Sequence, residues 1–233
     1  MTDSTVSCPL SARRSGEPVD KNAITIAVPK GRLLAECLDL FSRVNLKVSG
    51  GVDASRKLFF PSDDSSARFL VVRDKDIPTY VEYGAADMGV VGKDVLLEAG
   101  KDLLEPLDLG FGFCRIVVAE PSFGEHKEGT TGWGHPRVAT KYPKIAGDFF
   151  ASRGEHVEII PLYGAIELAP LTALADRIVD LVSTGETLRQ NSLKEVEEVV
   201  HVTARLVVNR ASLRTRSDRM VTLIEELREA SQT

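Results

Sequence analysis

The chain has 233 residues, of which 43% are hydrophobic and 27% are charged, and its formal net charge is −5. This length suffices for one large or two small globular units, and the modest negative charge does not favour binding to nucleic acid or to a membrane surface. The sequence contains no run of 18 apolar residues, so no segment is predicted to span a membrane.

The N-terminal segment and the cysteines indicate the compartment. Residues 1–22 are rich in serine, proline and charge, and they lack the continuous apolar stretch of a signal peptide. We expect a disordered tail on a cytoplasmic protein. The three cysteines, Cys8, Cys37 and Cys114, are odd in number and lack metal-ligand spacing, which favours free thiols in a reducing environment.

The first predicted elements enclose a basic turn. An apolar strand at 24–28 is followed by Lys30, Gly31 and Arg32, which together form a candidate anion site. The alternative is a solvated turn whose charge is incidental. A helix is predicted next, because apolar residues recur at helical spacing, namely Leu34, Cys37, Leu38 and Phe41.

Basic residues also flank the next two strands. Arg56 precedes the strand at 58–60, and Arg73 ends the strand at 68–73; a lone arginine at a strand end is more often just surface. A buried strand at 86–91 then leads into a helix with Asp94 in its first turn.

The middle of the chain suggests a passage between two lobes. Strands predicted at 103–109 and 115–119 flank a glycine-containing segment at 110–114, which we interpret as a crossing. Residues 120–136 lack periodicity and are expected to form a long exposed loop. Strands and helices then alternate, which predicts a parallel α/β core. The predicted segments are strand 137–140, helix 144–152, strand 157–162, helix 165–174, strand 178–182, extended chain 193–209 and a C-terminal helix within 211–233.

The turn after the strand at 178–182 is a candidate phosphate site. Ser183, Thr184 and Thr187 carry hydroxyls, Gly185 allows close backbone approach, and a helix predicted from Glu186 would present free N–H groups. The alternative is an ordinary capped helix start.

Two acids precede this turn. Asp180 lies in an otherwise apolar strand, where a carboxylate is costly unless it is paired or reaches a cleft, and Glu167 lies in a second apolar run. Carboxylates accept hydrogen bonds from sugar hydroxyls, so two of them beside a phosphate loop suit a ribose 5-phosphate.

These residues carry a resemblance to a known family. Residues 180–193, with 167–170 upstream, resemble the phosphoribosyl pyrophosphate (PRPP) site of ATP phosphoribosyltransferase, the first enzyme of histidine biosynthesis. The resemblance covers roughly residues 23 to 230. It continues through the segments 27–32, 55–58, 84–94 and 138–142.

The resemblance implies a fold. Short members of this family have a two-lobed α/β fold like that of type II periplasmic binding proteins, with a central cleft and no C-terminal regulatory domain. We expect lobe I to comprise 23–112 plus 205–233, and lobe II, which would bind PRPP, to comprise 113–204.

The resemblance also implies an activity: attack of adenine N1 of ATP on C1 of PRPP, which releases pyrophosphate. No general base is needed because adenine N1 is unprotonated at neutral pH. We expect Mg²⁺ to arrive on substrate oxygens, without a dedicated metal site. The expected catalytic residues are Arg32 and Arg56. The expected ATP and pyrophosphate site is Lys30, Gly31, Arg32, Arg56, Arg73 and Asp94. The expected PRPP site is Glu167, Asp180, Ser183, Thr184, Gly185, Glu186 and Thr187.

One residue departs from this scheme: Glu186 places a negative charge within the phosphate loop, which is tolerable only if its side chain points away. Two other functions compete. A solute-binding protein would not need the ribose-phosphate loop, and it would carry an export signal. A purine-type phosphoribosyltransferase would present two adjacent acids before the loop, and here only Asp180 precedes it.

The resemblance further implies partners. Short family members associate with a separate regulatory subunit that resembles histidyl-tRNA synthetase, and they form homodimers when alone. We therefore expect histidine to inhibit only the complex, because the chain has no segment left over for its own effector domain.

Overall fold

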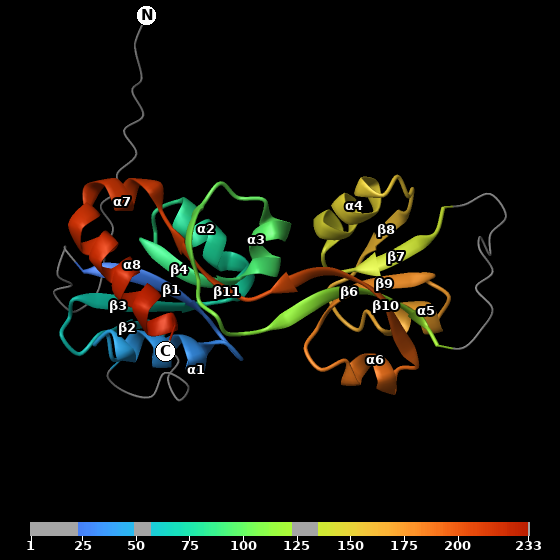
Figure 1. The fold of residues 1–233 in the computed structure, drawn as a ribbon, viewed down its shortest axis with the longest axis horizontal. Coiled ribbons are helices and arrows are strands. Elements are labelled where there is room, and N and C mark those ends of the chain that lie inside the picture. Colours follow the sequence, from blue (N-terminus) through green and yellow to red (C-terminus); the bar gives the residue numbers. More distant parts are fainter. Residues whose placement is uncertain (1–22, 49–56, 123–134, 233) are drawn as a thin grey trace, which may run out of the picture.

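The computed structural model describes residues 23–48, 57–122 and 135–232. Within them the strands form a six-stranded sheet, ordered β2-β3-β1-β4-β11-β5, and a five-stranded sheet, ordered β10-β6-β9-β7-β8. Figure 1 shows the two sheets, each with its helices, lying one after the other along the long axis of the molecule.

The first sheet is mixed. Strand β1 (Ile24–Pro29) is parallel to both its neighbours, β3 (Ala67–Val72) and β4 (Met88–Gly92). Strand β11 (Ala204–Val208) enters antiparallel between β4 and β5 (Leu104–Asp108), and β2 (Phe59–Pro61) adds an antiparallel edge.

Helices cover both faces of this sheet. Alternate residues of its strands point to opposite sides, so each face is apolar and needs a cover. Ile26 and Val28 pack into the cluster formed with α1 and α8, whereas Ala27 packs against α2 and α3. The helical segments of this part of the chain are α1 (Leu34–Arg43), the 3-10 turn η1 (Asp74–Asp76), α2 (Ile77–Glu82), α3 (Lys93–Ala99), α7 (Arg210–Thr215) and α8 (Ser217–Ser231).

The second sheet has a parallel half and an antiparallel half. Strand β7 (Arg137–Thr140) is parallel to β8 (Glu158–Pro161) and to β9 (Arg177–Val182). The long strands β6 (Cys114–Pro121) and β10 (Leu193–Val202) complete the sheet as antiparallel neighbours. One face packs against α4 (Pro143–Ser152), and the other packs against α5 (Leu168–Leu171) and α6 (Glu186–Gln190).

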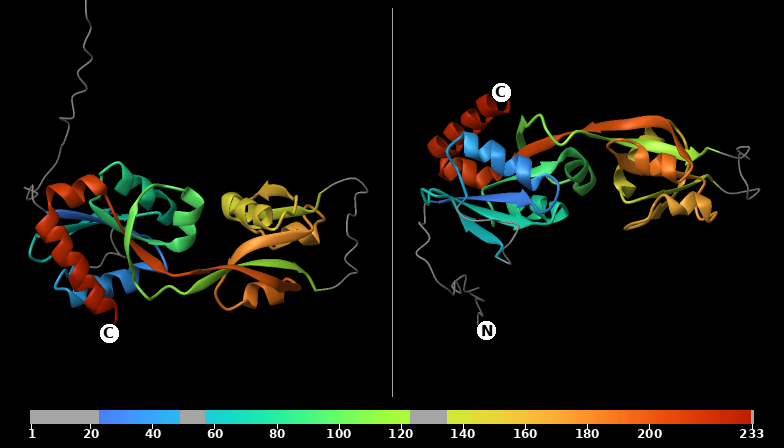
Figure 2. Two further views of the ribbon diagram at one scale, coloured as in Figure 1. Left: turned by 45° about the horizontal axis from the view of Figure 1, so that its top comes forward. Right: turned by 90° about the horizontal axis from the view of Figure 1, so that it is seen from below.

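Two short segments join the sheets (Figure 2). One connects β5 to β6 and contains Gly110 and Gly112, with φ of +69° and +70°. The other is Thr203, between β10 and β11. The predicted crossing at 110–114 is therefore confirmed. The division into lobes at 112/113 and 204/205 stays a prediction.

Three expectations about secondary structure were wrong. The core is mixed rather than parallel, because the strands next to the crossings run against their neighbours. The helix expected at 165–174 shrinks to α5, since Ala165 and Ala173 adopt positive φ on either side of it. The single helix expected within 211–233 is two helices, the first capped by the side chain of Asn209. The tail at 1–22, and most of the loop expected at 120–136, lie outside the described residues.

Candidate functional site

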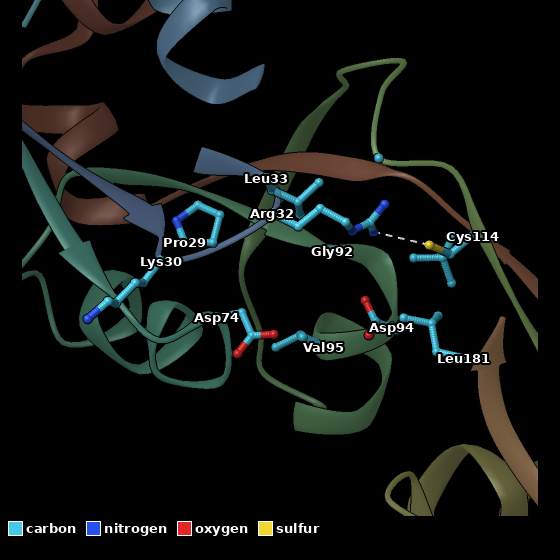
Figure 3. A pocket seen from close by; sticks show the side chains of 12 residues that line it. Pro29, Lys30, Arg32, Leu33, Asp74, Gly92, Asp94, Val95, Cys114 and Leu181 are labelled. Atoms are coloured by element: carbon cyan, nitrogen blue, oxygen red, sulfur yellow. Dashed lines mark hydrogen bonds between the residues drawn. The ribbon is translucent and has the colours of Figure 1, made fainter. Parts of the chain in front are cut away.

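A cavity of about 180 Å³ lies between the two sheets (Figure 3). The carboxyl ends of the parallel strands β1, β3 and β4 share one edge of the first sheet, which is where open α/β sheets bind ligands. Residues of the second sheet close the opposite wall. The cavity is lined by Pro29, Lys30, Arg32, Leu33, Asp74, Gly92, Asp94, Val95, Gly112, Cys114, Leu181 and Val202.

The predicted basic turn forms part of this wall. Gly31 adopts a φ of +108°, and its carbonyl accepts a hydrogen bond from Leu34 N–H, so the chain turns directly from β1 towards α1. The Arg32 guanidinium donates to Cys114 Sγ at 3.1 Å, a contact between the basic turn and the first residue of β6. Figure 3 shows Arg32 extended towards Cys114, with the Lys30 amine directed away from that contact. Both cations are exposed, so an anionic ligand can reach them.

Asp94 is buried at the opposite side of the cavity. Its Oδ2 accepts a hydrogen bond of 2.7 Å from the Tyr142 hydroxyl, which comes from the second sheet. Its Oδ1 lies 2.2 Å from the place where a Cβ on Gly92 would stand, so a larger residue at position 92 would force the Asp94 carboxylate to move. Burial and the nearby Asp94 carboxylate raise the pKa of Tyr142, which keeps the phenol neutral and able to donate.

Asp180 lies near the carboxyl end of β9, and its ion-pair partner is Lys141. The Lys141 amine lies 3.4 Å from Asp180 Oδ1, and the Asp180 side chain is 13% exposed. Burial raises the pKa of Asp180, and the charge of Glu167 raises it further, whereas Lys141 lowers it. Asp180 and Glu167 repel each other, and Lys141 pairs with Asp180. Carboxylate oxygens in this arrangement remain able to accept hydrogen bonds from the hydroxyls of a ligand.

The loop that follows β9 presents hydroxyls. Ser183, Thr184 and Thr187 are exposed, and Gly185 has a φ of +75°. The Glu186 carboxylate accepts hydrogen bonds from Arg189 and Gln190 of its own helix, which lower its pKa. The Glu186 side chain is therefore held along α6 by these two partners. This agrees with the expectation that its charge points away from the loop.

The predicted residues do not all meet at one cavity. Lys30, Arg32 and Asp94 line it, and exposed Gly31 lies between two of its lining residues. Arg73 is exposed and is not part of its wall, while Arg56 lies outside the described residues. The predicted PRPP residues Glu167, Asp180 and 183–187 also lie outside this wall. Gly185 lines a separate groove of about 460 Å³.

Three residues were missed as members of the site: Lys141, Tyr142 and Asp74. A signal for the first two was present, since they directly follow β7, whose parallel neighbour β9 carries Asp180. Residues that follow neighbouring parallel strands meet at one edge. Asp74 follows β3 and reaches the cavity in the same way.

The part of the chain that the structure describes contains no group of three or more histidine, cysteine or acidic side chains placed to hold a metal ion. Among the described helices, none has the length and apolar character needed to cross a bilayer.

Comparison with solved structures identifies the fold. The periplasmic aliphatic sulphonate binding protein SsuA from Escherichia coli matches with a TM-score of 0.57 at 14% identity, over 91% of this chain and 69% of that chain. This likeness concerns the fold alone, and it confirms the two-lobed architecture of type II periplasmic binding proteins.

Closer relatives identify the family. The ATP phosphoribosyltransferase of Syntrophotalea carbinolica is 55% identical over 204 residues, which cover 88% of this chain and 93% of that protein. The ATP phosphoribosyl transferase (HisG:HisZ) complex from Thermotoga maritima contains a chain that matches with a TM-score of 0.75 at 33% identity, over 90% of this chain and 98% of that chain. Residues 73–229 match the family model HisG, ATP phosphoribosyltransferase. The chain therefore belongs to the ATP phosphoribosyltransferase family.

Proposed function

We propose that this chain transfers the 5-phosphoribosyl group of PRPP to N1 of the adenine of ATP, the first step of histidine biosynthesis. The observation that carries the proposal is that a basic turn and an acidic strand end lie close together. Lys30 and Arg32 line the cavity together with Leu181, which directly follows Asp180 and lies two residues before the hydroxyl-bearing loop. Cations suit the polyphosphates, and acids with hydroxyls suit a ribose 5-phosphate.

The chemistry requires positioning rather than a base. The lone pair of adenine N1 forms a bond to C1 of the ribose, and the bond from C1 to the pyrophosphate oxygen breaks. No proton must leave N1, so the reaction can proceed without a catalytic histidine. Two reactants held in line gain most of their acceleration from orientation and from stabilisation of charge on the leaving group.

We assign roles to the side chains accordingly. Arg32 stabilises the negative charge that grows on pyrophosphate, and Lys30 adds to the local positive field. Glu167 and Asp180 accept hydrogen bonds from the ribose hydroxyls. The loop at 183–187 holds the 5-phosphate through hydroxyls and backbone N–H groups. Arg56 and Arg73 are proposed pyrophosphate and ATP contacts by resemblance alone.

Mg²⁺ is proposed to reach the site on the substrates. The donor set fits this mode, because magnesium in phosphate sites is bound by one or two carboxylates together with substrate oxygens. Asp74 lines the cavity and can supply one carboxylate, whereas Asp94 already accepts a hydrogen bond from Tyr142. The ion would screen the charge of the pyrophosphate.

We also propose that the chain is divided into lobe I (23–112 plus 205–233) and lobe II (113–204), that it acts in the cytoplasm and that it works with a regulatory subunit. The support for the subunit is that the matching chain from Thermotoga maritima was solved in a HisG:HisZ complex. Histidine should leave the isolated chain's activity unchanged and inhibit the complex. Calorimetry that detects tight histidine binding to this chain alone, together with inhibition, would contradict the proposal.

The activity is tested by incubating the chain with ATP, PRPP and Mg²⁺ and analysing the products by mass spectrometry. We expect an adduct ribosylated at adenine N1, together with pyrophosphate. Recovery of both substrates unchanged, with PRPP bound, would instead favour a solute-binding protein. The named transferase relatives do not favour that alternative.

A further inference from the structure

Helix α4 begins without a cap of its own. Its N-cap residue, Tyr142, makes no capping hydrogen bond with its side chain, and Pro143 has no N–H to donate. The first free N–H groups of the helix are therefore those of Lys144 and Ile145. Unpaired N–H groups at a helix start are normally satisfied by a nearby acceptor, most often the N-cap side chain.

The acceptor comes from the other sheet. Glu98, on α3, accepts a hydrogen bond from Lys144 N–H at one carboxylate oxygen and another from Ile145 N–H at the second oxygen, both at 3.0 Å. A carboxylate also interacts favourably with the positive end of the helix dipole. A residue of α3, which packs on the first sheet, thus caps a helix that packs on the second.

The neighbouring contact spans the same boundary. The Tyr142 hydroxyl donates to Asp94 at 2.7 Å, and both side chains are buried. Asp94 and Glu98 are four residues apart on α3, so one face of this helix supplies both acceptors. Together with the two chain crossings, the contact of Arg32 with Cys114 and the packing of Leu97 against the core of the second sheet, these hydrogen bonds join the two halves of the molecule beside the cleft.

The capped helix start lies next to residues of the proposed PRPP site. Lys141 directly precedes Tyr142, its amine lies 5.0 Å from the centre of the Tyr142 ring, and it pairs with Asp180. Any shift of the start of α4 relative to α3 therefore moves Lys141 and Asp180 relative to the cavity lined by Arg32.

We propose that Glu98 is a positioning residue for the transfer reaction: by capping α4 across the cleft, it fixes the second sheet at the distance and orientation at which the two substrates meet. This inference rests on the proposed function. A purely local role would affect the stability of α4. A positioning role affects turnover while PRPP binding to the second sheet remains intact.

The experiment compares the full chain with three variants: Glu98→Ala, Glu98→Gln and Asp148→Ala. Asp148 lies on α4 and pairs with the Lys144 side chain on the exposed surface, so its variant removes a carboxylate from the same helix and leaves both acceptor oxygens of the Glu98 cap in place. Hydrogen exchange at the Lys144 and Ile145 amides reports the cap. Calorimetric titration with PRPP reports binding, and turnover with both substrates reports positioning.

For Glu98→Ala we expect exchange at the two amides to rise about tenfold or more and turnover to fall about tenfold, with PRPP affinity within about twofold of the unmodified chain. Glu98→Gln keeps one acceptor oxygen, so its exchange rate and turnover should lie between those of Glu98→Ala and the unmodified chain. Asp148→Ala should match the unmodified chain in all three measurements. Faster exchange with turnover unchanged would overturn the proposal, and so would equal losses of turnover and PRPP affinity.

If Glu98→Ala does not fold, Glu98→Gln decides by the same criteria. Failure of the unmodified chain to form product would refute the proposed function itself. Failure of the positioning role is a different result: product is formed, and the Glu98 variants form it at the normal rate.

Discussion

The loops after β1 and after β9 are built alike and carry opposite chemistry. Each follows a strand with a parallel neighbour, turns through a glycine with positive φ (Gly31 and Gly185) and leads to a helix. The first loop carries Lys30 and Arg32. The second carries hydroxyls, and its one acid is neutralised by Arg189 of its own helix. Under the proposed function, two loops of the same strand-turn-helix form bind different parts of the substrates: the first binds polyphosphate through its cations, and the second binds ribose phosphate through its hydroxyls.

The largest effect that would sharpen this comparison is expected at the first loop. Arg32→Ala should lower turnover by about 100-fold and change substrate affinity less, because the lost donor acts on charge that develops as pyrophosphate leaves. Single-turnover kinetics measures this. Arg43→Ala is the control, since Arg43 is an exposed arginine on the following helix that pairs with Asp39. Equal single-turnover rates in both variants would make Arg32 an ordinary surface residue. Arg56→Ala is expected to behave like Arg32→Ala.

The second prediction concerns the acids of the other edge. Asp180→Asn and Glu167→Gln keep the shape of each side chain and remove its charge. Each should reduce kcat/KM for PRPP by about 10- to 100-fold, equivalent to roughly 1.5–3 kcal/mol for a lost charge-assisted hydrogen bond, and should affect ATP less. Steady-state kinetics with each substrate varied gives the answer, with Glu197→Gln as the control, since Glu197 is a half-buried acid on β10 that pairs with Arg153. Equal losses for ATP and PRPP would mean that the acids serve the fold.

A smaller effect is expected from the hydroxyls. Replacing Thr184 and Thr187 together by valine keeps the branched shape and removes only hydrogen bonding, so PRPP affinity should fall by about tenfold. Titration calorimetry measures the loss. Thr172→Val is the matched control, because that hydroxyl already donates to the Leu168 carbonyl. Affinity retained within about twofold, or roughly 0.4 kcal/mol, would place the phosphate elsewhere.

The smallest effect concerns stability. The pKa of Asp180 is raised in the folded protein, so its charged form lowers the free energy of unfolding. This destabilisation is fully present above the folded pKa, and it is lost as the pH falls from the folded pKa to the lower pKa of the unfolded chain. Asp180→Asn should therefore melt at the same temperature as the unmodified chain or up to about 2–4 °C higher at neutral pH, a shift equivalent to about 1 kcal/mol. The difference should shrink in acid. A lower melting temperature at neutral pH would show that the pair with Lys141 stabilises the fold.

The sequence predicts strands more reliably than it predicts their direction. The apolar runs that became β1, β7 and β9 are unmistakable, as are the turns that follow them. Direction depends on partners distant in the sequence: β11 joins β4 from more than a hundred residues away, and no local pattern encodes that pairing.

The candidate site was predictable to a similar extent. Residue types identified the loops at 30–32 and 183–187, because anion binding needs cations, hydroxyls and glycine in short turns. The contacts of Asp94 with Tyr142 and of Asp180 with Lys141 were not foreseen, since they depend on how two helices and two strands pack. Glu98 gave no sequence signal at all, because an acid on an amphipathic helix is usually solvated.

The place of β11 has a consequence for how the protein is made. This strand fills the gap between β4 and β5, yet it leaves the ribosome only after the whole second sheet. Until then β5 lacks its neighbour in the first sheet, and β4 presents an open edge of the kind that pairs with other chains. We therefore expect the nascent first half to depend on the completed second half, and truncations before Ala204 to aggregate rather than to yield a smaller folded unit.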